Sequence, residues 1–470
     1  MSRSRERSHL PLAVYRAGGR LDPATRFDED AGKLYTKLGY VWRETSSHPT
    51  DEQLDQLRQV GDKHADATVR EVFNKHKIYH DLLQEVKRAA ISSTGALNLL
   101  QQANTVPDWV DWDRIDRGQK VYFRHALSMS LVLLHFSLAG GYGAPFLSQV
   151  LAKTELLSGP GTKKRLWETA SMANDVMQEG ALRPGKAGWA TVMRVRLLHA
   201  RVRNWVGARE SYDAEAYGMP INQEDMAATL CAFSIAVVLG CDNIGVRISD
   251  QEAEDFIHVW RLVGYYIGVD EANNPCSSFK DAAAFMESIV RHIMHPDELG
   301  SKMANHLLQI LAWDFPLFAP YRAHCEIMRM MAGPIWADAL GIPRSRLVGY
   351  PIALQILALL RFFYWQPSFM EDKVMMQNCN NYGYVRTSTV HNIVNCTCTP
   401  CRSWPSPVLL LTTLVHGGQG DDALLYCNTY GCTYCTVLPG LAPVHLLAAL
   451  VHGRQGVQVP EVVHEPVRGG

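Results

Sequence analysis

The sequence predicts an all-α fold, built as one large helical domain and followed by an irregular, cysteine-rich tail. Apolar residues recur at spacings of three and four as far as residue 366, whereas the alternation typical of a half-buried strand is scarce. Beyond Pro367 the helical spacing fades, and Asn, Thr, Cys, Gly and Pro become frequent. We therefore predict a disordered arm over 1–30, the helical domain over 31–366, and the tail over 367–470.

Composition limits the classes of function. The 470 residues are 47% hydrophobic, which is enough for a large core. The formal net charge of -1 gives no basic field to attract nucleic acid, so we expect no such partner. Residues 1–7 are polar and arginine-rich with no apolar run behind them, which matches no signal peptide and favours a cytoplasmic protein.

Helix boundaries follow from apolar stripes and from the Gly, Pro and Ser residues between them. In the first predicted helix, for example, Leu54, Leu57 and Val69 belong to one inward stripe. The apolar stretches are too short or too interrupted to span a membrane, although 347–363 could lie at a membrane interface. The predicted helices are 51–73, 78–102, 118–136, 162–178, 189–206, 223–239, 250–267, 281–294, 300–312, 321–332 and 350–363.

The tail holds seven of the 11 cysteines. The CxxC pairs 398–401 and 432–435 are compatible with a zinc site, but their surroundings are irregular, and free thiols in a poorly ordered tail are the alternative. Neither pair is followed by His, which excludes covalent c-type haem attachment. An internal repeat with an offset of 36 residues has two copies, fewer than a solenoid needs, and indicates a tandem duplication or a faulty gene model.

One imidazole interrupts an aliphatic stripe in the predicted helix 189–206. His199 shares a helix face with Val192, Val195, Val202 and Val206. Burying an unpaired polar group costs roughly 2–7 kcal/mol, and no carboxylate lies three or four residues away to offset that cost. The side chain is therefore either a core histidine bonded to a backbone carbonyl or a ligand to a metal such as haem iron.

A second motif follows the Gly159-Pro160-Gly161 loop. Thr162 can cap the next helix, on which Arg165, Glu168 and Thr169 fall at i, i+3 and i+4 and can converge on one point. The alternative is an ordinary surface turn with a helical Arg-Glu pair.

Separate segments from about Thr50 to Phe363 resemble, in order, the latex-clearing-protein family of haem b rubber oxygenases. The same superfamily includes a fungal endoplasmic-reticulum oxygenase of mycophenolic acid biosynthesis. The segment 195–203 resembles the family's histidine helix and 165–169 resembles its distal motif. The other matching segments are 61–66, 106–112, 117–119, 218–226 and 260–269.

The resemblance implies a globin-like helical bundle that encloses haem b, with His199 as the axial ligand of the iron. Arg165, Glu168 and Thr169 would then be catalytic residues on the distal side, and Arg196 and Arg203 would bind the propionates; a solvated basic face, shared with Arg201, is the alternative. The implied reaction uses O2 to cleave C=C bonds of an isoprenoid or prenylated small molecule. Association with the endoplasmic-reticulum membrane is also implied.

This sequence departs from the family pattern in the distal motif. Glu168 stands where the rubber oxygenases have a Lys, and a carboxylate is a much poorer ligand to the iron. The acidic residue expected before the motif has only Gln149 and Glu155 as candidates. A non-catalytic helical protein that binds haem or lipid is therefore the alternative function.

Other enzyme classes lack their motifs. The sequence has no P-loop, no nucleophile elbow and no complete dinucleotide fingerprint, because 141–143 is an isolated fragment. None of the cysteines outside the tail lies in the loop that a cytochrome P450 needs. Met193, Met226 and Met303 are expected to pack in the core rather than to line a substrate tunnel.

Overall fold

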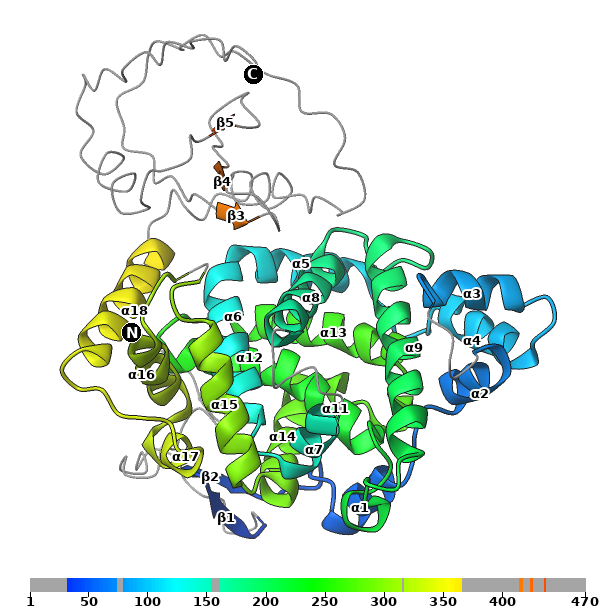
Figure 1. Ribbon diagram of the computed structural model, residues 1–470, viewed down its shortest axis with the longest axis horizontal. Coiled ribbons are helices and arrows are strands. Elements are labelled where there is room, and N and C mark those ends of the chain that lie inside the picture. The colour runs from blue at the N-terminus through cyan, green and yellow to red at the C-terminus, as the bar shows by residue number, and fades with distance from the viewer. Residues whose placement is uncertain are drawn as a thin grey trace, which may run out of the picture. The chain divides into compact units, whose positions relative to one another are not determined.

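The computed structural model describes residues 32–73, 79–153, 161–314 and 317–365, with three short strands between 414 and 436. Tertiary contacts divide the chain into two compact units, Met1–Gly383 and Tyr384–Gly470. The first unit is mostly helical, as predicted (Figure 1).

The described part of the first unit contains a β-hairpin, α-helices and three short helices of other types. The hairpin strands are β1 (Leu34–Lys37) and β2 (Tyr40–Arg43). The π-helix is η1 (Leu133–Ala139), and the 3-10 helices are η2 (Glu271–Asn273) and η3 (Pro275–Ser277). The α-helices are α1 (Asp51–Arg58), α2 (Lys63–Val72), α3 (Leu82–Ala89), α4 (Thr94–Asn104), α5 (Trp112–Arg124), α6 (Ala126–Val132), α7 (Pro145–Lys153), α8 (Gly161–Met177), α9 (Ala187–Gly207), α10 (Ala214–Tyr217), α11 (Gln223–Phe233), α12 (Ile235–Asn243), α13 (Asp250–Ile267), α14 (Phe279–Ile293), α15 (Glu298–Ile310), α16 (Tyr321–Ala332), α17 (Pro334–Ala339) and α18 (Gly349–Trp365).

Several predicted helices are confirmed closely. Helices α13 and α16 have the predicted bounds, and α8 and α9 begin and end within two residues of them. The end signals explain the accuracy at α13: Ser249 forms a capping box with Glu252, and Gly268 ends the helix in the left-handed conformation.

Two predicted helices are each divided by a side-chain cap. Asp62 accepts a hydrogen bond from the backbone of Ala65 and starts α2 inside the predicted helix 51–73. Ser93 caps α4 through the backbone of Ala96 and donates to Glu71 at 2.6 Å, which separates α4 from α3. These caps lie within apolar stripes, so the spacing alone predicted continuous helices.

The predicted helix 118–136 is wrong at its centre. The chain leaves the helical conformation at His125, and α5 meets the segment Ala126–Ala139 at an angle of 82°. No Gly or Pro marks this break, and the following π-helix changes the register of the apolar stripe. The predicted helix 223–239 is likewise divided, at Ser234, whose hydroxyl donates to the carbonyl of Leu230 at 2.7 Å.

The hairpin β1–β2 corrects the all-α prediction. The strands pair in antiparallel register, with Leu34 opposite Arg43, and turn through Leu38 and Gly39, both with positive φ. Tyr40 is buried and donates its hydroxyl to Ala332, which attaches the hairpin to the end of α16. The Leu-Gly turn between two short runs was the available signal.

The core lies around α11, α12 and α13, with α16 and α18 on one side and α2 to α4 on the other (Figure 1). Helix α5 crosses α13 at Gly118, where a Cβ atom would collide with the backbone of Asp255. Among the described residues, the segment 223–243 is apolar and long enough to cross a membrane, but it is 89% buried within the protein, as a core segment also is.

The second unit contains β3 (Leu414–His416), β4 (Ala423–Leu425) and β5 (Cys435–Thr436). They form an antiparallel sheet in the order β3, β4, β5, where the sequence predicted an irregular tail. The cysteine side chains of both CxxC pairs, the rest of the repeat and the arm over 1–30 lie outside the described residues.

Buried histidines predict that acid destabilises the fold. Burial lowers the pKa of His135 to about 3, and the pKa values of His258 and His324 to about 4, from an ordinary 6.5. The unfolded chain therefore takes up more protons, so stability is complete above pH 6.5 and falls as the pH approaches 4. Urea midpoints should decrease over this window, and less steeply in His324→Gln; a constant midpoint would contradict the expectation.

Candidate functional site

The candidate site lies between α8 and α9, which pack against each other. Apolar residues at helical spacing bury one side of α9 against the core, among them Val192, Leu197 and Ala200. Trp189 is also buried, and its indole donates to the backbone of Ala103 at 2.9 Å. These contacts fix the rotation of α9 and therefore the direction in which its other side chains point.

His199 lies on α9, close enough to Arg165 of α8 for the two side chains to interact electrostatically. Burial is the largest influence on the imidazole and, with the cations of Arg203 and Arg165, lowers its pKa to about 4, so the ring is neutral at physiological pH. Its Nδ1 atom is covered and has no hydrogen-bond partner in the described part of the chain. The side chain nevertheless keeps part of its accessible surface. In the described part of the chain, Nδ1 of His199 therefore lacks the carbonyl partner that a bonded core histidine would have.

The structure brings Arg165 to His199 and turns Glu168 outward. Burial lowers the pKa of Arg165, which interacts electrostatically with His199, Tyr142 and Glu168. Thr169 is half-buried on the next turn of α8. The side chain of Glu168 is 62% exposed, and Lys164 lies 3.7 Å away. The predicted convergence of the three residues thus holds in part, with Arg165 at the site and Glu168 at the surface.

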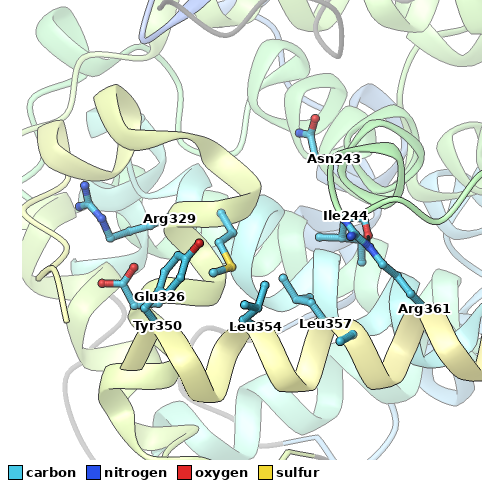
Figure 2. A pocket seen from close by; sticks show the side chains of 10 residues that line it. Asn243, Ile244, Glu326, Arg329, Tyr350, Leu354, Leu357 and Arg361 are labelled. Atoms are coloured by element: carbon cyan, nitrogen blue, oxygen red, sulfur yellow. Dashed lines mark hydrogen bonds between the residues drawn. The ribbon is translucent and has the colours of Figure 1, made fainter. Parts of the chain in front are cut away.

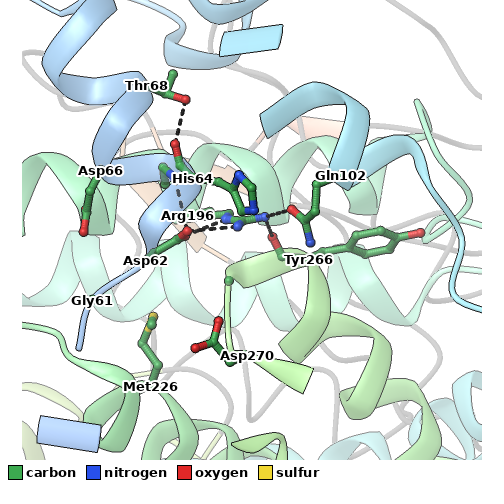
Figure 3. A network of polar contacts seen from close by, with 12 residues as sticks. Gly61, Asp62, His64, Asp66, Thr68, Gln102, Arg196, Met226, Tyr266 and Asp270 are labelled. Atoms are coloured by element: carbon green, nitrogen blue, oxygen red, sulfur yellow. Dashed lines mark hydrogen bonds and ion pairs between the residues drawn. The ribbon is translucent and has the colours of Figure 1, made fainter. Parts of the chain in front are cut away.

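Arg196 and Arg203, the two residues predicted to bind the propionates, each form an ion pair with a carboxylate. Arg196 pairs with Asp62 through two contacts, of 2.6 and 3.0 Å, and donates to Gln102 at 2.6 Å (Figure 3). Arg203 pairs with Asp66. Both arginines are buried, so the solvated basic face that was the alternative is wrong for them. The two ion pairs join α9 to α2 on either side of His199 in sequence, and we call them the α2–α9 clamp.

Backbone groups complete the α2–α9 clamp. Arg203 donates to the carbonyl of Ile221 at 2.7 Å, while Arg196 approaches the carbonyl of Tyr266 at 3.4 Å. Gly268 has a φ of +96°, and a Cβ atom there would collide with the carboxylate of Asp62. Glycine is thus required at this position for both conformation and space.

Sequence reasoning missed Asp62 and Asp66 as partners of α9. Their segment carried the family resemblance, but it lies more than 130 residues from the arginines, and no short-range pattern links the two. The available signal was a match of spacings: two aspartates four residues apart on α2, and two arginines seven residues apart on α9.

A buried carboxyl near the same helix was also missed. Asp225 lies in the first turn of α11, where burial and the neighbouring Glu224 raise its pKa to about 7. It interacts electrostatically with Arg203 of α9 and with Tyr212. Sequence reasoning took its segment only as family resemblance, because burial of a carboxylate is not visible in a local pattern.

Three further expectations concern residues near the site. Met193, Met226 and Met303 belong to the hydrophobic core, as predicted. Arg201 lies over the rings of Phe73 and Tyr79 in cation–π contacts. In the described ranges, no group of three or more His, Cys, Asp or Glu side chains could hold a metal ion.

Similarity to known proteins supports the fold and the family. In sequence, the chain is 23% identical over 267 residues to the rubber oxygenase of Streptomyces sp. (strain K30), which covers 54% of this chain and 64% of that protein. It is 25% identical over 199 residues to ER-bound oxygenase mpaB' of Penicillium brevicompactum, covering 40% and 44%, and 27% identical over 165 residues to mpaB of the same fungus, covering 34% and 38%. The chain thus spans less than two thirds of each relative's length.

The solved structure of latex clearing protein LCP in the closed state has a similar fold. The TM-score is 0.54 at 20% sequence identity, and the match covers 69% of this chain and 91% of that one. The family model for the catalytic domain of ER-bound oxygenase mpaB/B'/rubber oxygenase matches residues 124–362, which include α8, α9 and α18 up to Phe362. This chain belongs to the ER-bound oxygenase mpaB and rubber oxygenase family.

Proposed function

We propose that the protein is a haem b-dependent oxygenase that uses O2 to cleave C=C bonds of an isoprenoid or prenylated small molecule. The observation that carries the proposal is His199: a neutral imidazole that keeps part of its accessible surface and whose Nδ1 has no hydrogen-bond partner in the described protein, on the helix that resembles the family's histidine helix. Because the ring is neutral at physiological pH, one of its nitrogens carries a lone pair that could bind haem iron.

The residues present fit a haem in part. His199 would hold the iron, and Arg165 and Thr169 of α8 would face the bound molecule. That Arg196 and Arg203 bind the propionates stays a prediction, since each guanidinium would have to bind a propionate in addition to the carboxylate that it pairs with in the α2–α9 clamp. The same holds for a globin-like arrangement around the cofactor.

When bound, haem supplies the activation of dioxygen. The protein's own residues have simpler tasks. The clamp holds α9 against α2, so that the imidazole keeps its direction, and the apolar residues around α8 and α9 exclude water. Arg165, with its guanidinium partly desolvated, can stabilise negative charge that develops on a substrate oxygen atom.

The names of the relatives motivate the substrate class. A rubber oxygenase acts on an unsaturated isoprenoid, and two other relatives are ER-bound oxygenases. The haem-loaded protein should consume oxygen with squalene and release carbonyl products, but not with squalane, which has no double bonds. Equal oxygen consumption with both compounds, or none with either, would overturn the activity.

The second candidate, a non-catalytic haem or lipid carrier, has one observation in its favour. Glu168 takes the place of the family's Lys and faces solvent, so it offers no distal ligand. A carrier would bind haem or squalene without consuming oxygen, which separates the two functions in the same assay.

Arg165 and Thr169 yield a prediction about turnover. Arg165→Ala should lower the rate about 100-fold with haem still bound, as for loss of one charge-stabilising donor, and Thr169→Ala should lower it less. Lys164→Gln, on the exposed side of α8, is the matched control. Steady-state oxygen uptake checks the rates, and unchanged values for both variants would remove these residues from the site.

A further inference from the structure

We propose that the exposed face of α18, with the loop 344–348 before it, binds the surface of an anionic lipid membrane. This proposal does not depend on haem, because the face belongs to α16 and α18 rather than to α8 and α9 (Figure 1).

Large apolar side chains are exposed along α18 and in the loop before it. Leu347 is 93% exposed, and Leu354 and Leu359 are about half exposed. Val348 and Tyr350 add to the same surface. The solvent-exposed face of a helix is normally polar. Exposed apolar side chains of this kind therefore indicate a binding partner that the described residues do not supply.

Positive charge exceeds negative charge around the face, because the nearby carboxylates of Asp338 and Glu326 are already engaged: Asp338 pairs with Arg329 and Arg344, and Glu326 accepts a hydrogen bond from the backbone of Ser345. No Asp or Glu occurs from residue 339 to residue 370. Arg346 precedes Leu347, Arg361 ends the described side chains of α18, and the backbone of Arg322 lies against Gly349. All three arginines are exposed, and none forms an ion pair with another described residue. Apolar side chains flanked by unpaired cations are typical of helices that lie in a membrane interface.

A cavity of about 590 Å³ lies beside the same helix, between α12, α16 and α18. Figure 2 shows Leu354 and Leu357 along its floor, with Arg361 near one end and Tyr350 near the other. The guanidinium of Arg361 donates through Nε to the carbonyl of Ile244 at 2.6 Å, which leaves its terminal nitrogens for an anion. An acyl chain on the leucines, with its phosphate at Arg361, matches this arrangement.

Charge favours lipid over a second copy of the chain. Two copies packed through this face would bring Arg346 and Arg361 of each copy together, while the carboxylates of Asp338 and Glu326 already have partners, which is unfavourable. An anionic bilayer supplies both the negative charge for the arginines and the apolar medium for the leucines.

The test uses the full chain and vesicles of phosphatidylcholine with or without phosphatidylserine. We expect cosedimentation with the phosphatidylserine vesicles, weakened by added salt. The Arg346→Gln variant should bind about five-fold more weakly, and Arg346→Gln with Leu347→Ser more weakly still. The matched control is Arg88→Gln with Ile91→Ser, which changes an exposed Arg and a 94% exposed Ile near the start of α4.

Two results would overturn the proposal. One is that the protein binds neither kind of vesicle, or binds vesicles with and without phosphatidylserine equally well while the two double variants also bind with equal affinity. The other is a lipid-free dimer of the wild type that Leu347→Ser dissociates, because the face would then be an interface between copies. Both altered residues are exposed, so the variants should unfold at the same denaturant concentration as the wild type.

Discussion

The His199→Ala variant should lose haem while retaining its helices. The substitution removes the proposed iron ligand but little apolar contact, since the packed side of α9 is formed by other side chains, among them Val192, Leu197 and Ala200. We expect haem affinity to fall by at least 10–100-fold, the range for disturbing a metal site, with the far-ultraviolet circular dichroism nearly unchanged. The measurement is the haem content after gel filtration.

A matched control separates ligation from general destabilisation. His258→Ala also removes a buried imidazole, one that accepts a hydrogen bond from the backbone of Asp111 at 3.1 Å, but it lies on α13. This variant should keep its haem. Equal haem content in His199→Ala and the wild type would refute the ligand assignment, and equal loss in both variants would show that haem retention follows stability alone.

The Arg196→Gln variant should show the largest loss of stability. Removing one partner of a buried ion pair leaves the other charge uncompensated, at about 3–5 kcal/mol. Arg196 and Asp62 are 2% and 4% exposed. The comparison is Arg194→Gln on the same helix, where Arg194 is 40% exposed and its pair with Asp81 is expected to contribute about 0–1 kcal/mol. Guanidinium unfolding of the haem-free chains gives both values.

The pH dependence of this difference has a definite sign. Burial opposes ionisation of Asp62, but the charge and hydrogen bond of Arg196 outweigh it and leave the pKa below the ordinary 3.8. The stability from the pair is therefore complete above pH 3.8 and is lost as the pH falls through the folded value. The double variant Asp62→Asn with Arg196→Gln should be more stable than Arg196→Gln. Similar losses in Arg194→Gln and Arg196→Gln would contradict the role of the clamp.

The fold was predictable where local chemistry fixes a boundary. The capping box at Ser249 and the glycine at 268 define α13 in the sequence itself. The break at His125 was not predictable, because it depends on packing of α5 and α6 against different neighbours and has no Gly or Pro to announce it. The hairpin was missed because its strands are only four residues long.

The site was predictable at single residues but not in its pairings. The aliphatic stripe of α9 identified His199 as exceptional, and the structure leaves its Nδ1 without a described partner. The directions of Arg196 and Glu168 depend on what surrounds α8 and α9 in space. Asp62, far away in sequence at the start of α2, forms an ion pair with Arg196. Glu168 is exposed to solvent and lies near Lys164.

The central claim is that this chain binds haem b through His199, and the absorption spectrum of the purified full-length protein tests it most directly. The spectrum should be recorded after supplying haemin, before and after reduction with dithionite. The account predicts a Soret band that shifts on reduction, and a pyridine haemochrome of the b type. A spectrum without a Soret band, or with only that of free haemin, would contradict it.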